Sequence, residues 1–447
     1  MTLPQSGTPV DFILELKYSD IPEPTIHFAR RCLLDLIGVA AAGVSTPLSI
    51  AIRKHAVEQL AAGSGGVSML FDSRPVSPMG AALAGGMTID SMDAHDGHKL
   101  VKGHVGCGVL PGLLAFTQAE EHFDDREFLT SLVIGYELGT RAGIALHATA
   151  SDYHTSGAWV SIAVAALGAR ALKLNPQQTR EAMGIAEYHG PRSQMMRVID
   201  SPTMVKDGSG WGAMAGVSAA YLAADGFTGA PAITVEDEQL ESLWADLGEN
   251  WRIHEQYFKP YPVCRWAQPP VEAALALCRS HDIHSTDIEH IEVATFHEAR
   301  RLCTPLPENT EQAQYSLPFA TAAAIVFGEL GPEQISGQVL QHPEVTRLSA
   351  AVKIVEEDQF NLEFPARRLA RVVLHTKDGQ SYQSEVTEAR GDPEAPLDDT
   401  EIVHKFHHLA DPPLGVERAN QIETLVKYLG SGEGITDLMK SITSNII

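Results

Sequence analysis

Cysteine is scarce in this chain of 447 residues, and the few cysteines form no pattern. No two of them have the CxxC spacing, and their number is odd. These features exclude a disulfide framework and a zinc ribbon as the basis of the fold. The five positions are Cys32, Cys107, Cys264, Cys278 and Cys303.

Long hydrophobic runs are also missing. The first residues, MTLPQSGTPVDFILELKY, contain no basic segment followed by a long apolar stretch, so no signal peptide is visible. No apolar stretch approaches the length of a membrane span without interruption. We therefore predict a cytoplasmic protein with no membrane partner.

Basic residues are outnumbered by acidic ones. The chain has 33 Lys and Arg against 57 Asp and Glu, which gives a formal net charge of −24. Binding to nucleic acid requires clustered Lys and Arg, so we expect no nucleic-acid partner. If the substrate is an anion, local positive charge must gather it against the field of the whole protein. Basic residues beside a motif are therefore stronger candidates for binding an anionic substrate.

The apolar pattern predicts a mainly α fold with a smaller α+β domain. The length favours two domains. Residues 26–247 form segments that are apolar around most of a helical surface, which is typical of a buried helix cluster. Small residues at spacings of four, Gly212, Gly216 and Ala220, allow close approach of helices.

The sequence changes character after Trp266. Residues 288–296, 366–376 and 379–386 alternate as strands do, and helical stretches lie between the first two. We predict an α+β domain over residues 267–396, inserted in an all-helical main domain of residues 1–266 and 397–447.

The densest set of chemical groups lies between Asp90 and Gly108, in DSMDAHDGHKLVKGHVGCG. Helical segments flank this stretch, which makes it a rigid mount for a catalytic loop. A structural turn does not need so many proton carriers, whereas acid–base chemistry does. A solvated, hydrogen-bonded turn is the alternative. The candidates that we take from this loop are Asp93, His98 and His104.

Two further segments carry candidates at helix starts. His154, in YHTSG, precedes a helix whose positive end disfavours the imidazolium and leaves a neutral base; the alternative is a capping or core histidine. Lys206 stands before a Gly/Ser turn that opens a helix, so its ammonium and backbone N–H groups can converge on one carboxylate. The spacing fits neither a phosphate loop nor a dinucleotide fingerprint. A surface lysine is the alternative.

The junction between the predicted domains supplies the remaining candidates. Lys259 and Arg265 bracket the proline-stiffened segment KPYPVCR, and domain junctions are favoured ligand sites. A hinge with charged edges is the alternative. Tyr315 starts a helix in the second domain, where it can supply a hydroxyl to a closed cleft or serve only in packing.

Five motifs together resemble the MmgE/PrpD family, which includes 2-methylcitrate dehydratase, cis-aconitate decarboxylase and iminodisuccinate epimerase. They occur in family order over nearly the whole chain: the Asp93–His104 loop followed by GCGVLPG, YHTSG at 153–157, the Lys206 turn, KPYPVCR at 259–265 and QYSLPFA at 314–320. The resemblance implies a helical main domain with a smaller α+β lid, a homodimer, no cofactor and no metal. It also implies an active site between the domains, lined by Asp93, His104, His154, Lys206, Lys259 and Tyr315.

Two departures bear on the reaction. Dehydratases of the family typically carry an Asp–Asp–Thr type of loop, but residues 93–98 read DAHDGH and lack the threonine. The decarboxylase has a histidine in its KPYP segment where this chain has Cys264. Both differences, with the shorter chain, make the sequence more similar to the iminodisuccinate epimerase branch.

We therefore predict a cofactor-independent epimerase that abstracts a proton next to a carboxylate of an iminodisuccinate-like polycarboxylate. His154 and one group from Asp93, His98 and His104 would act from opposite faces, with Tyr315 as a further catalytic group. The substrate carboxylates would be held by Lys206, Lys259 and Arg265. A dehydratase or a decarboxylase of a tricarboxylate is the alternative.

Two other classes stay open at this point. A divalent metal bound by the loop would give a hydrolase or a metal-assisted lyase, but the loop has no HxxxH or HExxH spacing. A binding or scaffold protein without activity is the second. The residues weighed as metal ligands are His95, His98, His104, Asp93 and Asp96.

Overall fold

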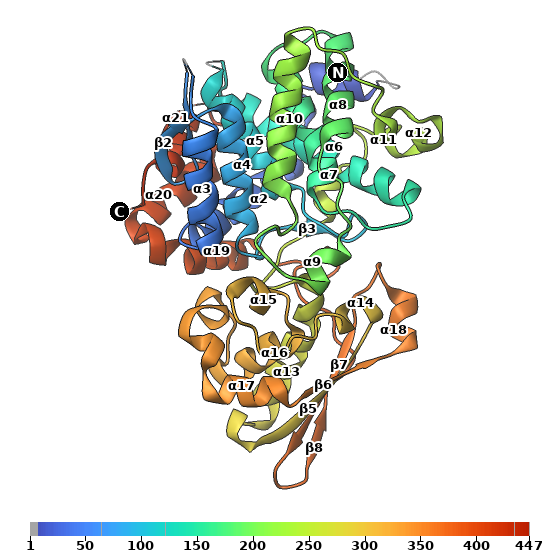
Figure 1. The fold of residues 1–447 in the computed structure, drawn as a ribbon, viewed down its shortest axis with the longest axis vertical. Helices are drawn as coiled ribbons and strands as arrows, with labels where there is room; N and C mark the ends of the chain where they lie inside the picture. The colour runs from blue at the N-terminus through green and yellow to red at the C-terminus, as the bar shows by residue number, and fades with distance from the viewer. Residues whose placement is uncertain (1–7, 64, 121, 433, 447) are drawn as a thin grey trace.

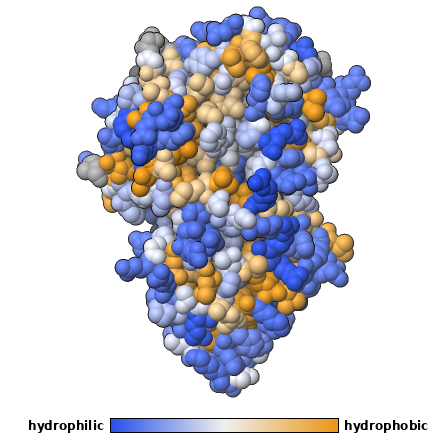
Figure 2. Space-filling view, viewed as in Figure 1, coloured by the Kyte–Doolittle hydropathy of each residue, from blue (hydrophilic) through white to orange (hydrophobic). Residues whose placement is uncertain are grey.

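The computed structural model describes residues 8–63, 65–120, 122–432 and 434–446. Its ribbon divides into a larger helical body and a smaller body that contains a four-stranded sheet (Figure 1). In the space-filling view, side chains close the space between the two ribbons (Figure 2). The predicted mainly α architecture with a smaller α+β part is confirmed.

The larger body is built from helices of both the first half and the end of the chain, with two short pairs of antiparallel strands. Its helices are α1 (Pro9–Glu15), α2 (Glu23–Gly43), α3 (Pro47–Gln59), α4 (Pro78–Asp90), α5 (Gly106–Ala119), α6 (Asp125–Thr149), α7 (Gly157–Ala171), α8 (Pro176–His189), α9 (Met196–Asp200), α10 (Ser209–Ala224), α11 (Ile233–Glu236), α12 (Glu241–Trp244), α19 (Asp399–Leu414), α20 (Val416–Tyr428) and α21 (Ile435–Thr443). β1 (Val67–Met69) and β2 (Asp72–Val76) form a hairpin, and β3 (Gly97–His98) pairs antiparallel with the distant β4 (Gln256–Tyr257).

The smaller body packs helices on one sheet of order β6-β5-β7-β8. β5 and β6 are parallel, and the other neighbours are antiparallel. Its elements are α13 (Gln268–His281), β5 (Ile288–Thr295), α14 (His297–Arg300), α15 (Thr310–Gln314), α16 (Leu317–Phe327), α17 (Pro343–Ala350), β6 (Val352–Glu356), α18 (Asp358–Glu363), β7 (Ala370–Thr376) and β8 (Ser381–Gln383).

The strands of this sheet follow the predicted alternation, with one exception. Along β5 and β7 the residues alternate between buried and half-buried, because one face of the sheet packs against helices. We predicted no strand at β6. Its side chains are at most half-buried and it lies at the edge of the sheet, so its local pattern is weak.

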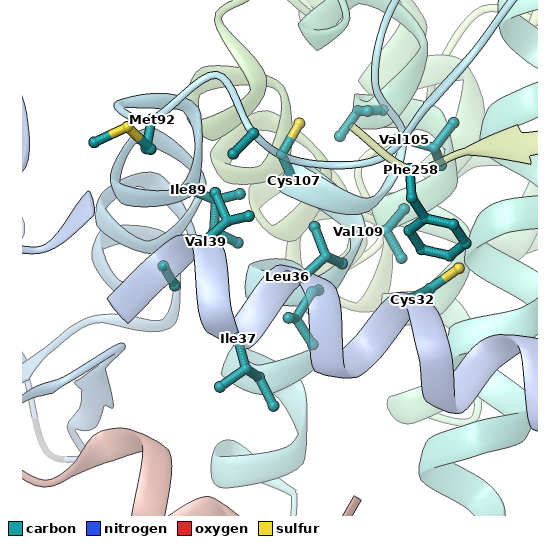
Figure 3. Packing of buried hydrophobic residues seen from close by; sticks show 14 of the residues in the cluster. Cys32, Leu36, Ile37, Val39, Ile89, Met92, Val105, Cys107, Val109 and Phe258 are labelled. Carbon is teal, nitrogen blue, oxygen red and sulfur yellow. The ribbon is translucent and has the colours of Figure 1, made fainter. Parts of the chain in front are cut away.

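The core of the larger body holds both ends of the Asp93–His104 loop. Met92 precedes the loop and Val105 follows it, and both are buried. Figure 3 shows these residues beside Leu36 and Val39 of α2 and Ile89 of α4, in one apolar cluster. The loop is therefore anchored at each end by packing.

Glycines let α10 approach two other helices. A Cβ added at Gly212 would lie 2.4 Å from the carbonyl oxygen of Gly157 on α7, and one at Gly86 of α4 would lie 2.5 Å from the Cα of Gly210. The predicted role of small residues in close helix packing is confirmed. This packing fixes the start of α10, which follows the Lys206 turn.

Within the described ranges, no single helix is long and apolar enough to cross a membrane. Helices α2 and α3 reach the required length and composition only as a pair, and they are bent by 92° at the break between them.

We expect Gly212→Ala to destabilise the protein by about 1–3 kcal/mol, because the new methyl group meets backbone atoms of α7 that cannot yield without moving a helix. Urea unfolding followed by circular dichroism measures the change. Ser218→Ala, on the same helix and half-buried, is the control and should change the free energy of unfolding by less than about 0.5 kcal/mol. Equal stability of the two variants would contradict the close packing of α10.

Candidate active site

The loop between α4 and α5 is buried, not solvated. Asp93, His95, Asp96, His98 and His104 are each at most 6% exposed. Burial of so many ionisable groups is costly unless they are paired or neutral. The alternative interpretation of the loop as a solvated turn is wrong, and the question becomes how each group is satisfied.

An ion pair between Lys259 and Asp93 lies at the centre of the cluster. The Lys259 ammonium contacts one Asp93 carboxylate oxygen and lies 3.3 Å from the Asp93 carbonyl oxygen. Burial alone raises the pKa of Asp93, but the ammonium groups of Lys259 and Lys206 hold it well below its ordinary value. Burial alone lowers the pKa of Lys259, but Asp93 raises it above its ordinary value. Both groups are therefore charged.

Lys206 contacts two residues of the smaller body, Gln314 and Tyr315. Its ammonium donates a 2.7 Å hydrogen bond to the side-chain oxygen of Gln314 and lies 4.7 Å from the ring centre of Tyr315. The same Gln314 oxygen accepts the backbone N–H of Asp93 at 2.9 Å. Burial raises the pKa of Tyr315 well above its ordinary value, so its hydroxyl stays protonated. The structure thus brings Lys206, Lys259, Asp93 and Tyr315 together, as predicted.

His104 is oriented as a neutral base. Its Nδ1 lies 2.5 Å from the carbonyl oxygen of Asp96, and because a carbonyl only accepts, Nδ1 carries the proton. The bare Nε2 lies 3.9 Å from a carboxylate oxygen of Asp93 and 3.7 Å from one of Asp207. Burial, and then the charge of Lys259, lower the pKa of His104 well below its ordinary value.

His95 is a second buried imidazole beside His104. The two rings meet edge to face with centres 4.2 Å apart. His95 Nε2 lies 3.3 Å from a carboxylate oxygen of Asp90. Burial lowers the pKa of His95 to about 3, so this ring is also neutral. In the sequence we had weighed His95 only as a metal ligand.

Asp207 is a carboxyl group that we did not predict. Burial, and then the charges of Asp90 and Asp93, raise its pKa to about 7. The Ser156 hydroxyl donates to Asp207 at 2.9 Å and accepts the backbone N–H of His104 at 3.0 Å. The YHTSG motif therefore contributes its serine to the cluster. An acidic residue directly after Lys206 was the available sequence signal.

The start of α10 is occupied by a group of the protein itself. Asp90 accepts the backbone N–H of Ser209 at 3.1 Å, in the place where we predicted a substrate carboxylate. Burial raises the pKa of Asp90 to about 6. We predicted that Lys206 and this N–H group bind the same substrate carboxylate. This prediction is wrong for the N–H group, which already donates to Asp90.

Three predicted site residues have their partners elsewhere. His98 Nε2 lies 2.7 Å from a carboxylate oxygen of Glu255. Arg265 donates to two backbone carbonyls and to Gln268, and it pairs with Asp392 at 2.9 Å.

The third, His154, is half-buried on a connecting segment. Its backbone N–H donates to the imidazole of His147 at 3.1 Å, and burial, then the charge of Arg192, lower its pKa. In the described part of the chain, none of the hydrogen bonds or ion pairs of His98, Arg265 and His154 reaches Asp93 or His104.

The donor set does not suit a divalent metal. Asp93, His95 and His104 do carry ligand atoms within 4.8 Å of one another. However, Lys259 already contacts the Asp93 carboxylate, and the charge of Lys206 acts on the same group. A dication would have to displace one ammonium and lie beside the other. Two lysines thus supply the positive charge that a metal would bring.

Comparison with known proteins covers both bodies. The MmgE/PrpD N-terminal domain matches residues 10–245, and the MmgE/PrpD C-terminal domain matches residues 261–430. The chain is 24% identical to a cis-aconitate decarboxylase-like protein, oryM, of Aspergillus oryzae (strain ATCC 42149 / RIB 40), over 98% of this chain and 96% of that protein. It is 23% identical to a cis-aconitate decarboxylase of Aspergillus terreus (strain NIH 2624 / FGSC A1156), over 95% and 93%.

We expect Asp207→Asn to reduce the loss of stability that occurs between pH 6 and pH 8. A carboxyl whose pKa is raised to about 7 in the folded state stabilises the protein below the unfolded pKa, and this contribution is lost as the pH rises through 7. Between pH 6 and pH 8 the wild type should lose about 1 kcal/mol through this group. Asparagine cannot ionise, so urea unfolding at both pH values should show a smaller difference in the variant. An unchanged difference would mean that Asp207 is ionised throughout.

Proposed function

Because this chain belongs to the MmgE/PrpD family, we propose that it is a lyase that moves a proton at a carbon next to a carboxylate of a polycarboxylate substrate. The observation that carries this proposal is the neutral His104 imidazole, whose bare Nε2 lies 3.7 Å from the Asp207 carboxyl. The likeness to cis-aconitate decarboxylases supports the lyase class.

The two carboxyl groups nearest His104 take different roles. Asp93 is ionised because of Lys259 and Lys206, and it holds the Lys259 ammonium in place. Asp207, whose pKa is raised to about 7, can hold a proton near neutral pH. Pairs of titratable groups with pKa values pushed apart are typical of an acid and a base in one site. We assign the base to His104 and the acid to Asp207.

The lysines stabilise the charge that develops on the substrate. Removing a proton next to a carboxylate, or losing CO2, leaves negative charge that spreads onto carboxylate oxygens. Cations fixed in a buried site stabilise such charge more strongly than water does. Lys206 and Lys259 are 2% and 0% exposed and meet this requirement. Tyr315, beside Lys206, can donate its hydroxyl to the same oxygens.

Both lyase reactions use this set. In a dehydration, His104 Nε2 takes the proton from carbon, the C–H electron pair forms the double bond, and the departing hydroxyl takes the Asp207 proton to leave as water. In a decarboxylation, the electron pair of the broken C–C bond stays on the substrate as CO2 leaves, and Asp207 supplies the proton that replaces it. The dehydration uses both groups, whose His104 Nε2 and Asp207 carboxyl oxygen lie 3.7 Å apart, and the decarboxylation uses the Asp207 proton.

The epimerase that we predicted requires groups on opposite faces. We had assigned one face to His154, whose hydrogen bond and neighbouring charges lie outside the cluster. Epimerisation would then depend on Lys206 or Tyr315 as the second group. The geometry favours a lyase over the iminodisuccinate epimerase, for which neither domain match nor relative adds support. Cytoplasmic location, a homodimer and independence of a cofactor stay predictions.

We expect His104→Gln to slow a dehydration by at least about 10²-fold, since it removes the base that takes the proton from carbon. His154→Gln is the matched control and should change the rate by only a few-fold, because its contacts lie outside the cluster. Turnover of cis-aconitate and 2-methylcitrate is followed by NMR in D2O.

The products of that experiment decide the reaction class. A dehydratase releases water and forms a carbon–carbon double bond, and a decarboxylase releases CO2. Exchange of the α-hydrogen of a candidate polycarboxylate with no such product would contradict the lyase proposal and restore the epimerase. A large effect of His154→Gln with none of His104→Gln would overturn the assignment of the base.

A further inference from the structure

Arg368 is a buried guanidinium that has no counter-ion among the described residues. The residue is 2% exposed and precedes β7 in the smaller body. One terminal nitrogen donates to the carbonyl oxygen of Lys99 at 3.3 Å. The other terminal nitrogen and Nε have no hydrogen-bond partner in the ranges described. A buried charge left in this state is unfavourable, so the guanidinium has unused capacity to bind an anion.

Lys102 is a second cation at the same place. It is 8% exposed, and its ammonium donates to the carbonyl oxygen of Leu100 at 3.2 Å and lies 4.0 Å from the ring centre of Tyr153. Within the described chain, no carboxylate lies within ion-pair distance of it. Its backbone is left-handed, with a φ of 52°, a conformation that costs energy in a residue with a side chain.

The two cations meet at one turn. The carbonyl oxygen of Lys99 accepts both the Arg368 guanidinium, at 3.3 Å, and the backbone N–H of Lys102, at 3.2 Å. Burial, and then the charge of Arg368, lower the pKa of Lys102 to about 8. Lys102 belongs to the Asp93–His104 loop of the larger body and Arg368 to the smaller body, so the pair spans their junction.

Among the described residues, no carboxylate forms an ion pair with either cation at this turn. Lys99 contacts Glu394 at 2.7 Å and Asp392 at 3.5 Å. Glu298 on α14 acts on Lys102 through its charge, but without an ion-pair contact. The two cations are therefore available to an incoming anion.

Tyr257 connects Arg368 to the proposed active site. The Arg368 guanidinium lies 5.3 Å from the centre of its ring. The His104 ring approaches the same tyrosine at 6.4 Å, edge to face. Arg368 and His104 thus both lie against the Tyr257 ring.

We propose that Lys102 and Arg368 form a second anion subsite, which binds the carboxylate of the substrate that is remote from the reacting carbon. Arg368 offers a planar fork that matches a carboxylate in bidentate geometry, and Lys102 adds a point charge. Lys206 and Lys259 hold the carboxylate at the reacting carbon. The substrate is then at least a dicarboxylate, and one with a single carboxylate is a poor ligand. The identity of the ligand rests on the proposed function, but the subsite does not.

Calorimetric binding of unreactive acids to the full-length protein tests this subsite. The probes are propane-1,2,3-tricarboxylate, butyrate and inorganic phosphate. We expect the wild type to bind the tricarboxylate at least about tenfold more tightly than butyrate, and Arg368→Gln to lose this preference while its affinity for butyrate is unchanged. Arg368→Lys should keep part of it, since the charge remains.

Arg367→Gln is the matched control. Arg367 is adjacent in sequence, half-exposed and paired with Glu388 at 3.0 Å, so its loss should leave the preference intact. Lys102→Met is an independent variant from the other body and should lower tricarboxylate affinity in the same direction. It carries the test if Arg368→Gln does not fold.

The outcomes separate the subsite from the proposed reaction. An unchanged preference in Arg368→Gln and Lys102→Met, or an equal loss for both acids, would overturn the subsite even if lyase activity is present. Phosphate that binds as tightly as the tricarboxylate and depends equally on Arg368 would overturn the assignment to a carboxylate. A preference that depends on Arg368, together with no turnover of cis-aconitate or 2-methylcitrate, would support the subsite and contradict the lyase proposal.

Discussion

The buried ion pair between Lys259 and Asp93 sets the electrostatics of the whole site. It fixes a segment of the domain junction to the loop between α4 and α5, and removing either partner would leave an uncompensated charge in the interior, at a cost of about 3–5 kcal/mol. Burial lowers the pKa values of His95 and His104, and the positive charge of Lys259 lowers them further. The ion pair therefore helps to hold the loop and to keep these two imidazoles neutral.

Two aspartates of this cluster, Asp93 and Asp207, have very different pKa values because their surroundings differ. Asp93 contacts an ammonium group and is ionised, whereas Asp207 is bonded to the Ser156 hydroxyl and lies near the negative charges of Asp90 and Asp93. A neutral base, a protonated acid and two fixed lysines result from position alone. This is the set that proton transfer next to a carboxylate requires.

The sequence predicted the architecture and about half of the cluster, and the reason lies in what determines each contact. The loop, Lys206, Lys259 and Tyr315 stand in recognisable motifs. Ser156 stands in the YHTSG motif and Asp207 follows Lys206, but their roles, like that of Arg368, depend on which buried groups face them. His98 shows the converse, since Glu255 is its partner only through the pairing of β3 with β4. Short edge strands such as β6 are not predicted, because they too are defined by their partner strand and not by a local apolar pattern.

The protonation state of His104 tests the account most directly. Nitrogen-15 NMR of protein labelled at histidine, with His104 assigned by its loss in the Gln variant, distinguishes the neutral tautomers from the imidazolium. The account predicts a neutral ring at pH 7 with the proton on Nδ1, because Nδ1 donates to the Asp96 carbonyl and burial lowers the pKa. An imidazolium at pH 7, or a proton on Nε2, would contradict it.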